Sequence, residues 1–264
     1  MFTERLRQIF HPERMGVRRV EATASSLQVN QPATADVDGD WRYERKYFLD
    51  SISAEDTELM IRLCPHYFRQ VHPDRYINNI YLDSATLRCY WENLDGVSPR
   101  FKQRIRWYGD LHQDNAAATL EIKRKYNAVG DKIRVPLGAF NTSNDITNDG
   151  VYSLLKSAGS DRPFRSHGDG FRCTLVNRYL RRYYATFDSL FRATIDRELQ
   201  YYPLEGGQRK KGLIVREKAT ILEIKYAKDH ESIAREILQS LPYRPARISK
   251  YVHGINMLRA HHYL

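Results

Sequence analysis

Residues 101–108 read FKQRIRWY, and this stretch decides the fold because it alternates between two kinds of side chain. Successive side chains of a β-strand point to opposite faces of a sheet. One face therefore carries Lys102, Arg104 and Arg106, and the other carries Phe101, Ile105 and Trp107. The stretch predicts a strand with a cationic face and an apolar face.

The same alternation recurs in WRYERKYF (41–48), LEIKRKY (120–126), NRYLRRYY (177–184), FRATID (191–196) and ILEIKY (221–226). One face of these strands collects charged or polar side chains, namely Arg42, Glu44, Lys46, Glu121, Lys123, Lys125, Tyr179, Arg181, Arg192, Thr194, Asp196, Glu223 and Lys225. The opposite faces are aromatic and aliphatic, which is typical of faces packed beneath helices. A solvated polar face would explain any one of these strands. Six such strands that concentrate Arg and Lys favour the lining of a closed barrel.

A lumen crowded with like charges is costly when it holds no counter-ion, because desolvation costs several kcal/mol per ion. The lumen is therefore expected to be wet and to hold an anion. Dense phosphate fits best, since Arg offers planar bidentate donors and Lys offers a point charge.

The remaining pattern predicts an α+β fold, an antiparallel β-barrel tunnel with flanking helices. The predicted strands are 41–49, 77–83, 101–108, 119–126, 131–136, 174–187, 190–199, 212–217 and 220–226. Helical periodicity predicts helices over 54–64 after Ser53, from Asn148 or Asp149 through Leu155, over 230–241 after Asp229, and from Ser249 through Leu258. Residues 41–264 are expected to form this tunnel domain. Residues 1–40 are expected to form a flexible basic arm.

Composition narrows the partners and the compartment. The 264 residues carry 42 Lys and Arg against 32 Asp and Glu, a net charge of +10 that favours a polyanionic partner. Nucleic acid is disfavoured, because the aromatic side chains fall mainly opposite the cations and would not be free to stack on bases. No apolar run approaches the roughly 18 residues that span a bilayer, and the first residues do not resemble a secretory signal. A cytoplasmic protein is expected, with Cys64, Cys89 and Cys173 as reduced thiols.

The strands WRYERKYF, FKQRIRWYG, LEIKRK and ILEIK, with the closing RISKYVHG (247–254), resemble the polyphosphate polymerase domain of the vacuolar transporter chaperone (VTC) complex. That family belongs to the triphosphate tunnel metalloenzyme superfamily. The resemblance covers residues from about 41 to the C-terminus and lies in the order of the motifs. It implies a tunnel that makes polyphosphate from ATP with a divalent metal, Mn²⁺ or Mg²⁺.

The resemblance also implies roles for individual residues. The catalytic tunnel cations would be Lys46, Arg104, Arg106, Lys123, Arg181, Arg192 and Lys250. The substrate contacts would be Lys125, Tyr179, Arg247 and Ser249, and the metal-binding glutamate would be Glu223. The membrane domains of the eukaryotic complex have no counterpart in this sequence, so a membrane-associated partner remains an open expectation.

Three positions depart from the family patterns. Triphosphatases and adenylate cyclases of the superfamily open with Glu-x-Glu-x-Lys, whereas positions 42, 44 and 46 are Arg, Glu and Lys. A missing carboxylate weakens activation of water, which favours the polymerase branch. Lys125 stands where the family has a histidine, and Arg247 stands where it has a lysine. A tripolyphosphatase or nucleoside triphosphatase of the same fold, and a module that binds polyphosphate or inositol polyphosphates without turnover, remain the alternatives.

Overall fold

The structure is a computed structural model that describes residues 42–126, 129–160, 170–205, 207–209 and 212–263. The predicted arm, residues 1–40, lies outside the described residues. The strands are β1 (Arg42–Leu49), β2 (Arg69–Asp83), β3 (Arg100–Tyr108), β4 (Ala116–Tyr126), β5 (Val129–Phe140), β6 (Arg172–Ala185), β7 (Phe191–Glu205), β8 (Gln208–Arg209), β9 (Val215–Glu217) and β10 (Thr220–Ala227). The helices are α2 (Ala54–Leu63), α3 (Arg88–Asp95), α4 (Asn148–Ser157), α6 (Glu231–Gln239) and α7 (Lys250–Ala260), with a 3₁₀ turn at Lys228–His230.

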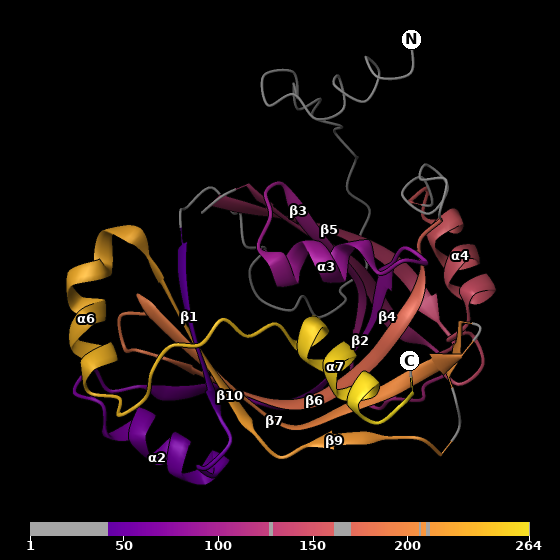
Figure 1. Cartoon of the computed structure of the whole chain (residues 1–264). Coiled ribbons are helices and arrows are strands. Elements are labelled where there is room, and N and C mark those ends of the chain that lie inside the picture. Colours follow the sequence, from indigo (N-terminus) through magenta and orange to yellow (C-terminus); the bar gives the residue numbers. More distant parts are fainter. Residues whose placement is uncertain (1–41, 127–128, 161–169, 206, 210–211, 264) are drawn as a thin grey trace, which may run out of the picture. The chain divides into compact units, whose positions relative to one another are not determined.

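The strands form one antiparallel sheet in the order β1-β10-β7-β6-β2-β3-β4-β5, with β8 and β9 paired to β7 (Figure 1). The predicted α+β class with flanking helices is confirmed. The predicted closure of the barrel is not observed, because no backbone pairing joins β1 to β5 among the described residues, and the sheet stays open. The segment before α7 uses part of the free edge of β1, where the Ala246 N–H donates to the Lys46 carbonyl at 2.7 Å.

The outer, convex face of the sheet packs against helices in two apolar clusters. Trp107 and Ile105 of β3 pack in one cluster with Val151 and Leu155 of α4. The second cluster joins β1, β7 and β10 to α2 and α6, and its fully buried members include Tyr47, Ile61, Leu222, Ile224 and Ile237. The side chains predicted to face helices therefore do so.

Helix α7 lies on the concave face of the sheet (Figure 1). Tyr251, Ile255 and Leu258 pack there against inward side chains of β2, β6 and β7. The approach is close, because a Cβ at Gly254 would lie 2.6 Å from the Leu175 Cδ2 atom. Ser249 caps the helix, as predicted, by accepting the Val252 N–H at 3.4 Å.

Several predicted boundaries were wrong. Helix α3 was not predicted, because its first N–H groups are capped from a distance: Asp83 accepts the N–H groups of Cys89 and Tyr90, each at 2.8 Å. Asp229 lies in the 3₁₀ turn and does not cap α6. Strand β5 extends through Pro136 and Gly138, which an edge strand tolerates because part of its backbone needs no partner. No described helix is long and apolar enough to cross a membrane.

Candidate functional site

The concave face beside α7 carries a group of buried ion pairs, and the first is built on Asp196 of β7. This carboxylate is fully buried. Arg181 donates to it through Nε, at 2.5 Å from Oδ1, and through Nη2, at 2.7 Å from Oδ2. Lys250 Nζ also lies 2.5 Å from Oδ2. Burial alone would raise the pKa of Asp196, but Arg181 and Lys250 lower it. Asp196 therefore stays ionised and fixes both cations in place.

The second ion group is built on Glu121 of β4. The carboxylate contacts Arg104 at 2.6 Å, Lys132 at 2.7 Å, Arg134 at 3.5 Å and Arg106 at 3.6 Å. Burial opposes ionisation of Glu121, yet Arg104, Arg106 and Lys132 hold its pKa well below the usual range. One carboxylate thus organises four cations from β3 and β5.

The third ion group joins β1 to β10 through two carboxylates and two lysines. Lys46 Nζ lies 3.4 Å from Glu44 Oε1 and 3.8 Å from Glu223 Oε2. Lys225 Nζ lies 2.7 Å from Glu223 Oε1 and 3.9 Å from Glu44 Oε1. Burial favours a raised pKa for Glu223, but the opposite effect of Lys225 and Lys46 is larger, and the pKa of Glu223 is well below its usual value. Glu223 therefore stays ionised, and it shares Lys46 and Lys225 with Glu44.

Side-chain contacts also span the open side of the sheet. Lys123 of β4 reaches Glu44 of β1, with 3.2 Å between Nζ and Oε2. Strand β1 is one edge of the sheet, and β4 lies next to β5, which is the other edge. The inward side chains of the two ends therefore meet although their backbones do not pair.

Tyr179 joins the first two ion groups. Its hydroxyl accepts from Arg106 Nη2 at 3.4 Å, and Lys250 Nζ lies 4.9 Å from its ring centroid. Burial raises the pKa of Tyr179, but Arg181, Arg106 and Lys250 outweigh that effect and lower it. The surrounding cations therefore favour the ionised form of the Tyr179 hydroxyl.

Lys102 is a member of this site that the sequence analysis did not select. Its Nζ donates to Ser249 Oγ at 2.8 Å. Burial, followed by repulsion from Lys46 and Lys123, lowers the pKa of Lys102 to about 7. No described carboxylate forms an ion pair with Lys102, whereas Arg104 and Arg106 on the same strand both pair with Glu121. The signal was present, because Lys102 shares a strand face with Arg104 and Arg106.

The structure brings most of the predicted site residues together. Those joined by the contacts above are Lys46, Arg104, Arg106, Lys123, Arg181, Lys250, Tyr179, Ser249 and Glu223. Lys125 lies close enough to Arg100 and Lys123 for their repulsion to add to the burial that lowers its pKa. Arg192 is exposed and faces Lys225 in the register of β7 with β10. Arg247 is exposed and has no ion pair with a described residue, so the structure does not bring it into the group.

We refer to the basic and acidic side chains that the three ion groups, Lys123 and Lys102 bring together as the cationic cluster. Its basic members are Lys46, Lys102, Arg104, Arg106, Lys123, Lys132, Arg134, Arg181, Lys225 and Lys250, and its acidic members are Glu44, Glu121, Asp196 and Glu223. Ten basic groups against four carboxylates leave an excess of six positive charges when every lysine is protonated. Such an arrangement attracts a multivalent anion.

A metal ion would find few protein ligands in the cationic cluster. Among the described residues, no group of three or more His, Cys, Asp or Glu side chains is placed to hold a metal. Glu44 and Glu223 nevertheless lie close enough to share two lysines. Mg²⁺ and similar hard cations are often bound by one or two carboxylates together with substrate phosphates. The two glutamates fit that type of site and do not fit a site made of protein ligands alone.

The chain matches the VTC domain family over residues 41–259. It therefore belongs to the VTC domain family, as the order of its charged strands indicated. A search of curated proteins gives no match.

Several solved structures are similar to the chain at low identity. The PH1819 protein from Pyrococcus horikoshii is 15% identical, with 81% of this chain and 99% of that chain covered and a TM-score of 0.46. A putative adenylyl cyclase from Hippeastrum, described as having a dominant triphosphatase activity, is 19% identical, with coverages of 81% and 94% and a TM-score of 0.49. A putative adenylate cyclase from Vibrio parahaemolyticus is 11% identical, with coverages of 77% and 86% and a TM-score of 0.42. These likenesses are distant, and the assignment of the chain rests on the family match.

Proposed function

We propose that the chain is a polyphosphate polymerase, which transfers the γ-phosphate of ATP to the end of a growing polyphosphate chain. The observation that carries the proposal is the cationic cluster, whose basic residues are held in place by buried carboxylates. A surface that only needed solubility would not hold so many cations on buried counter-ions, because each buried ion costs several kcal/mol of desolvation. Membership of the VTC domain family supports the same activity.

The residues of the cationic cluster are assigned two binding roles. Arg104, Arg106, Lys123, Arg181 and Arg192 would hold the triphosphate of ATP, with Tyr179 and Ser249 as uncharged contacts. Lys46 and Lys250 would hold the acceptor chain at the cationic cluster. Lys125 and Arg247, which are not members of the cluster, would contact that chain nearer solvent. Lys102, whose amine contacts Ser249, would add a further cation to the site.

Phosphoryl transfer requires mainly alignment and charge stabilisation from the protein. A terminal phosphate oxygen of the acceptor attacks the γ-phosphorus, the bond from that phosphorus to the β,γ-bridging oxygen breaks, and ADP leaves with the electron pair. The polyphosphate chain grows by one phosphate. The acceptor end is already anionic near neutral pH, so no general base is required. Arginines fixed by Glu121 and Asp196 would stabilise the charge that develops on the non-bridging oxygens.

A divalent metal, Mn²⁺ or Mg²⁺, would be held by Glu223 with Glu44 and would neutralise charge on the phosphates. These two carboxylates are the acidic members of the cluster that share their lysines. Glu121 and Asp196 each contact two cations at 2.7 Å or less, whereas Glu223 has one such contact, with Lys225, and the nearest cation to Glu44 is Lys123 at 3.2 Å. The metal is therefore expected beside β1 and β10.

A triphosphatase is the second candidate, because the same cationic cluster would hold tripolyphosphate equally well. The carboxylate pair of Glu44 and Glu223 would also suit a metal that activates water. The two activities differ in the acceptor alone. A binding module without turnover would use the same cations and neither chemistry.

Product analysis separates these activities. Purified protein is incubated with ATP and Mn²⁺, the products are resolved on a gel stained for polyphosphate, and free phosphate is measured in parallel. The polymerase gives a ladder of chains and releases one ADP for each phosphate that it adds. Free phosphate without chains would establish the triphosphatase and overturn the proposal, and no turnover with retained tripolyphosphate binding would establish the binding module.

A matched pair of lysine variants ties the activity to the cationic cluster. Lys123→Ala removes a side chain that is 53% exposed and contacts Glu44, so the fold should be retained. Lys156→Ala removes an exposed lysine from α4 on the outer face. A charged hydrogen bond contributes about 1.5–3 kcal/mol, so Lys123→Ala should weaken tripolyphosphate binding about tenfold or more. Lys156→Ala should leave it unchanged, and equal effects would argue against the cluster.

A further inference from the structure

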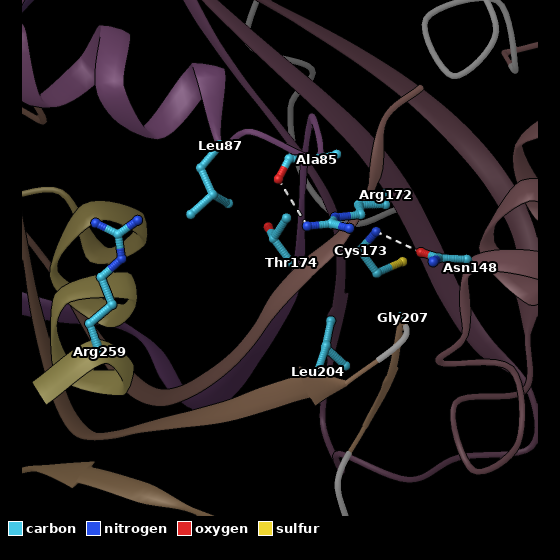
Figure 2. A pocket seen from close by; sticks show the side chains of 9 residues that line it. All are labelled: Ala85, Leu87, Asn148, Arg172, Cys173, Thr174, Leu204, Gly207 and Arg259. Atoms are coloured by element: carbon cyan, nitrogen blue, oxygen red, sulfur yellow. Dashed lines mark hydrogen bonds between the residues drawn. The ribbon is translucent and has the colours of Figure 1, made fainter. Parts of the chain in front are cut away.

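A separate cavity of about 480 Å³ lies away from the cationic cluster. It is formed by the start of β6, the end of β7, the turn before α3 and the C-terminal part of α7 (Figure 2). No member of the cationic cluster lines it. Its volume falls within the range of about 300–1,000 Å³ that is typical of small-molecule sites.

Two arginines face this cavity from different elements. Arg172 of β6 donates through Nη2 to the Ala85 carbonyl at 2.9 Å. The guanidinium carbon of Arg259, from α7, lies 4.8 Å and 5.1 Å from the ring centroids of Tyr90 and Trp91. Neither arginine forms an ion pair with any residue in the described part of the chain. Figure 2 shows the two arginine side chains on different sides of the space.

The wall between the two arginines is mainly apolar. Leu87, Leu204 and Cys173 contribute aliphatic or sulfur atoms. Asn148 accepts the Cys173 N–H at 2.8 Å through Oδ1, which leaves its NH₂ group without a hydrogen-bond partner among the described residues. The cavity thus combines apolar surface, two cations and one amide donor.

We propose that this cavity binds a small organic anion, a molecule with an apolar body and a carboxylate, sulfonate or phosphate group. Inorganic polyphosphate does not fit, because it has no apolar surface to place against Leu87 and Leu204. A neutral apolar molecule would leave both guanidinium groups without a counter-ion. The organic anion satisfies both parts of the wall, since its acidic group pairs with arginine while its body displaces water from the leucines.

The probe for this site is 8-anilinonaphthalene-1-sulfonate, which combines two aromatic groups with one sulfonate. The full chain is first saturated with tripolyphosphate, so that the cationic cluster is occupied. Binding is then followed by fluorescence and by calorimetry. We expect one probe per chain, bound independently of the tripolyphosphate concentration. Displacement by tripolyphosphate would place the probe in the cationic cluster and overturn the proposal.

Variants of the two arginines test the charge requirement. Arg259→Gln and Arg172→Gln should each weaken probe binding by about tenfold, and Arg259→Lys should recover part of the loss. The matched control is Arg69→Gln, since Arg69 also stacks on an aromatic ring, that of Phe187 at 5.4 Å, but lies elsewhere on β2. Both tested arginines are at least partly exposed, so the variants should fold, and their melting temperatures are measured to check this. Unchanged affinity in Arg259→Gln and Arg172→Gln, or an equal loss in Arg69→Gln, would overturn the site whatever the outcome of the polymerase assay.

Discussion

The concave face of the sheet has two parts that differ in how they are filled. Under α7, Leu175 of β6 and Tyr201 of β7 are fully buried against Tyr251 and Ile255. Further along β6, Arg181 faces inward into the cationic cluster. Tyr179 marks the border, because it packs in the apolar cluster and also contacts Arg106.

The difference shows how one sheet face serves both stability and binding. Helix α7 fills the first part with buried side chains. No helix in the described part of the chain covers the second part, where the cations pair with four carboxylates. Lys250 belongs to both parts, because it begins α7 and contacts Asp196. Substitutions in the two parts should therefore fail in different ways.

Arg181→Ala should have the largest effect, because it harms both folding and activity. Asp196 is fully buried and would keep only the Lys250 contact of its two ion pairs. Breaking a buried ion pair from one side costs about 3–5 kcal/mol of unfolding free energy. Urea denaturation should show a loss near the lower end of that range, together with loss of polyphosphate synthesis.

The control for Arg181→Ala is Arg197→Ala on the outer face of β7. Arg197 contacts Asp74 at 3.2 Å with its side chain 26% exposed, so its ion pair is weaker. Outer ion pairs of this kind contribute about 0–1 kcal/mol. Equal losses in the two variants would contradict the buried anchor at Asp196.

Glu223→Gln should separate binding from turnover within the charged part. The amide keeps the size of the side chain but offers no charge to a hard divalent cation, which prefers carboxylate oxygen. Tripolyphosphate affinity should be retained or increased, because one negative charge is removed from the cluster. Turnover at limiting Mn²⁺ should fall at least tenfold. Unchanged turnover across a Mn²⁺ titration would move the metal to another carboxylate of the cluster.

Gly254→Ala should damage the apolar part instead. The added Cβ would lie 2.6 Å from both Leu175 Cδ2 and Tyr201 Cδ1, whose side chains are fully buried. Overpacking of this kind costs about 1–3 kcal/mol, which exceeds the gain of up to about 1 kcal/mol in helix propensity. The melting temperature should fall while tripolyphosphate binding below that temperature changes less. A stability equal to wild type would show that Leu175 and Tyr201 can move aside.

The faces of the strands could be predicted from the sequence because alternation is a local property. Ile105 and Trp107 lie outside and Arg104 and Arg106 inside, as FKQRIRWY indicated. Other features depend on distant partners. Helix α3 is capped by Asp83, which lies six and seven residues before the N–H groups that it binds. The sequence next to the start of the helix does not indicate such a cap.

The site was predictable to a similar degree. The sequence indicated a lumen crowded with like charges, but the structure shows that Asp196 and Glu121 neutralise much of that repulsion. Which carboxylate meets which cation depends on strand order, which alternation does not encode. Arg247 has the right charge but lies on the exposed segment before α7. Its position follows from the path of that segment along β1 and could not be inferred from its neighbours in sequence.

The smallest expected effect is a change in proton uptake, and it tests Lys102 as the one lysine of the cluster whose pKa is lowered to about 7. An unfolded chain would hold this proton up to a pKa near the ordinary lysine value of about 10.4. The charged amine therefore destabilises the free protein fully below pH 7, and that penalty disappears as the pH rises from about 7 toward 10. The unfolding free energy should rise with pH over this window, and Lys102→Met should remove that part of the slope.

Bound tripolyphosphate should reverse the shift, because its negative charge favours the protonated amine. At pH 8 the free protein has mostly neutral Lys102, so binding should take up about one proton more in wild type than in Lys102→Met. Calorimetry in two buffers with different ionisation enthalpies measures that number, and the proton exchange of the ligand itself cancels between the two proteins. Lys132, whose pKa is lowered to about 8 mainly by burial, contributes to both proteins alike. An equal proton uptake in wild type and variant would mean that the phosphate does not reach Lys102, and the anion would then lie nearer Arg104 and Arg181 than the helix cap at Ser249.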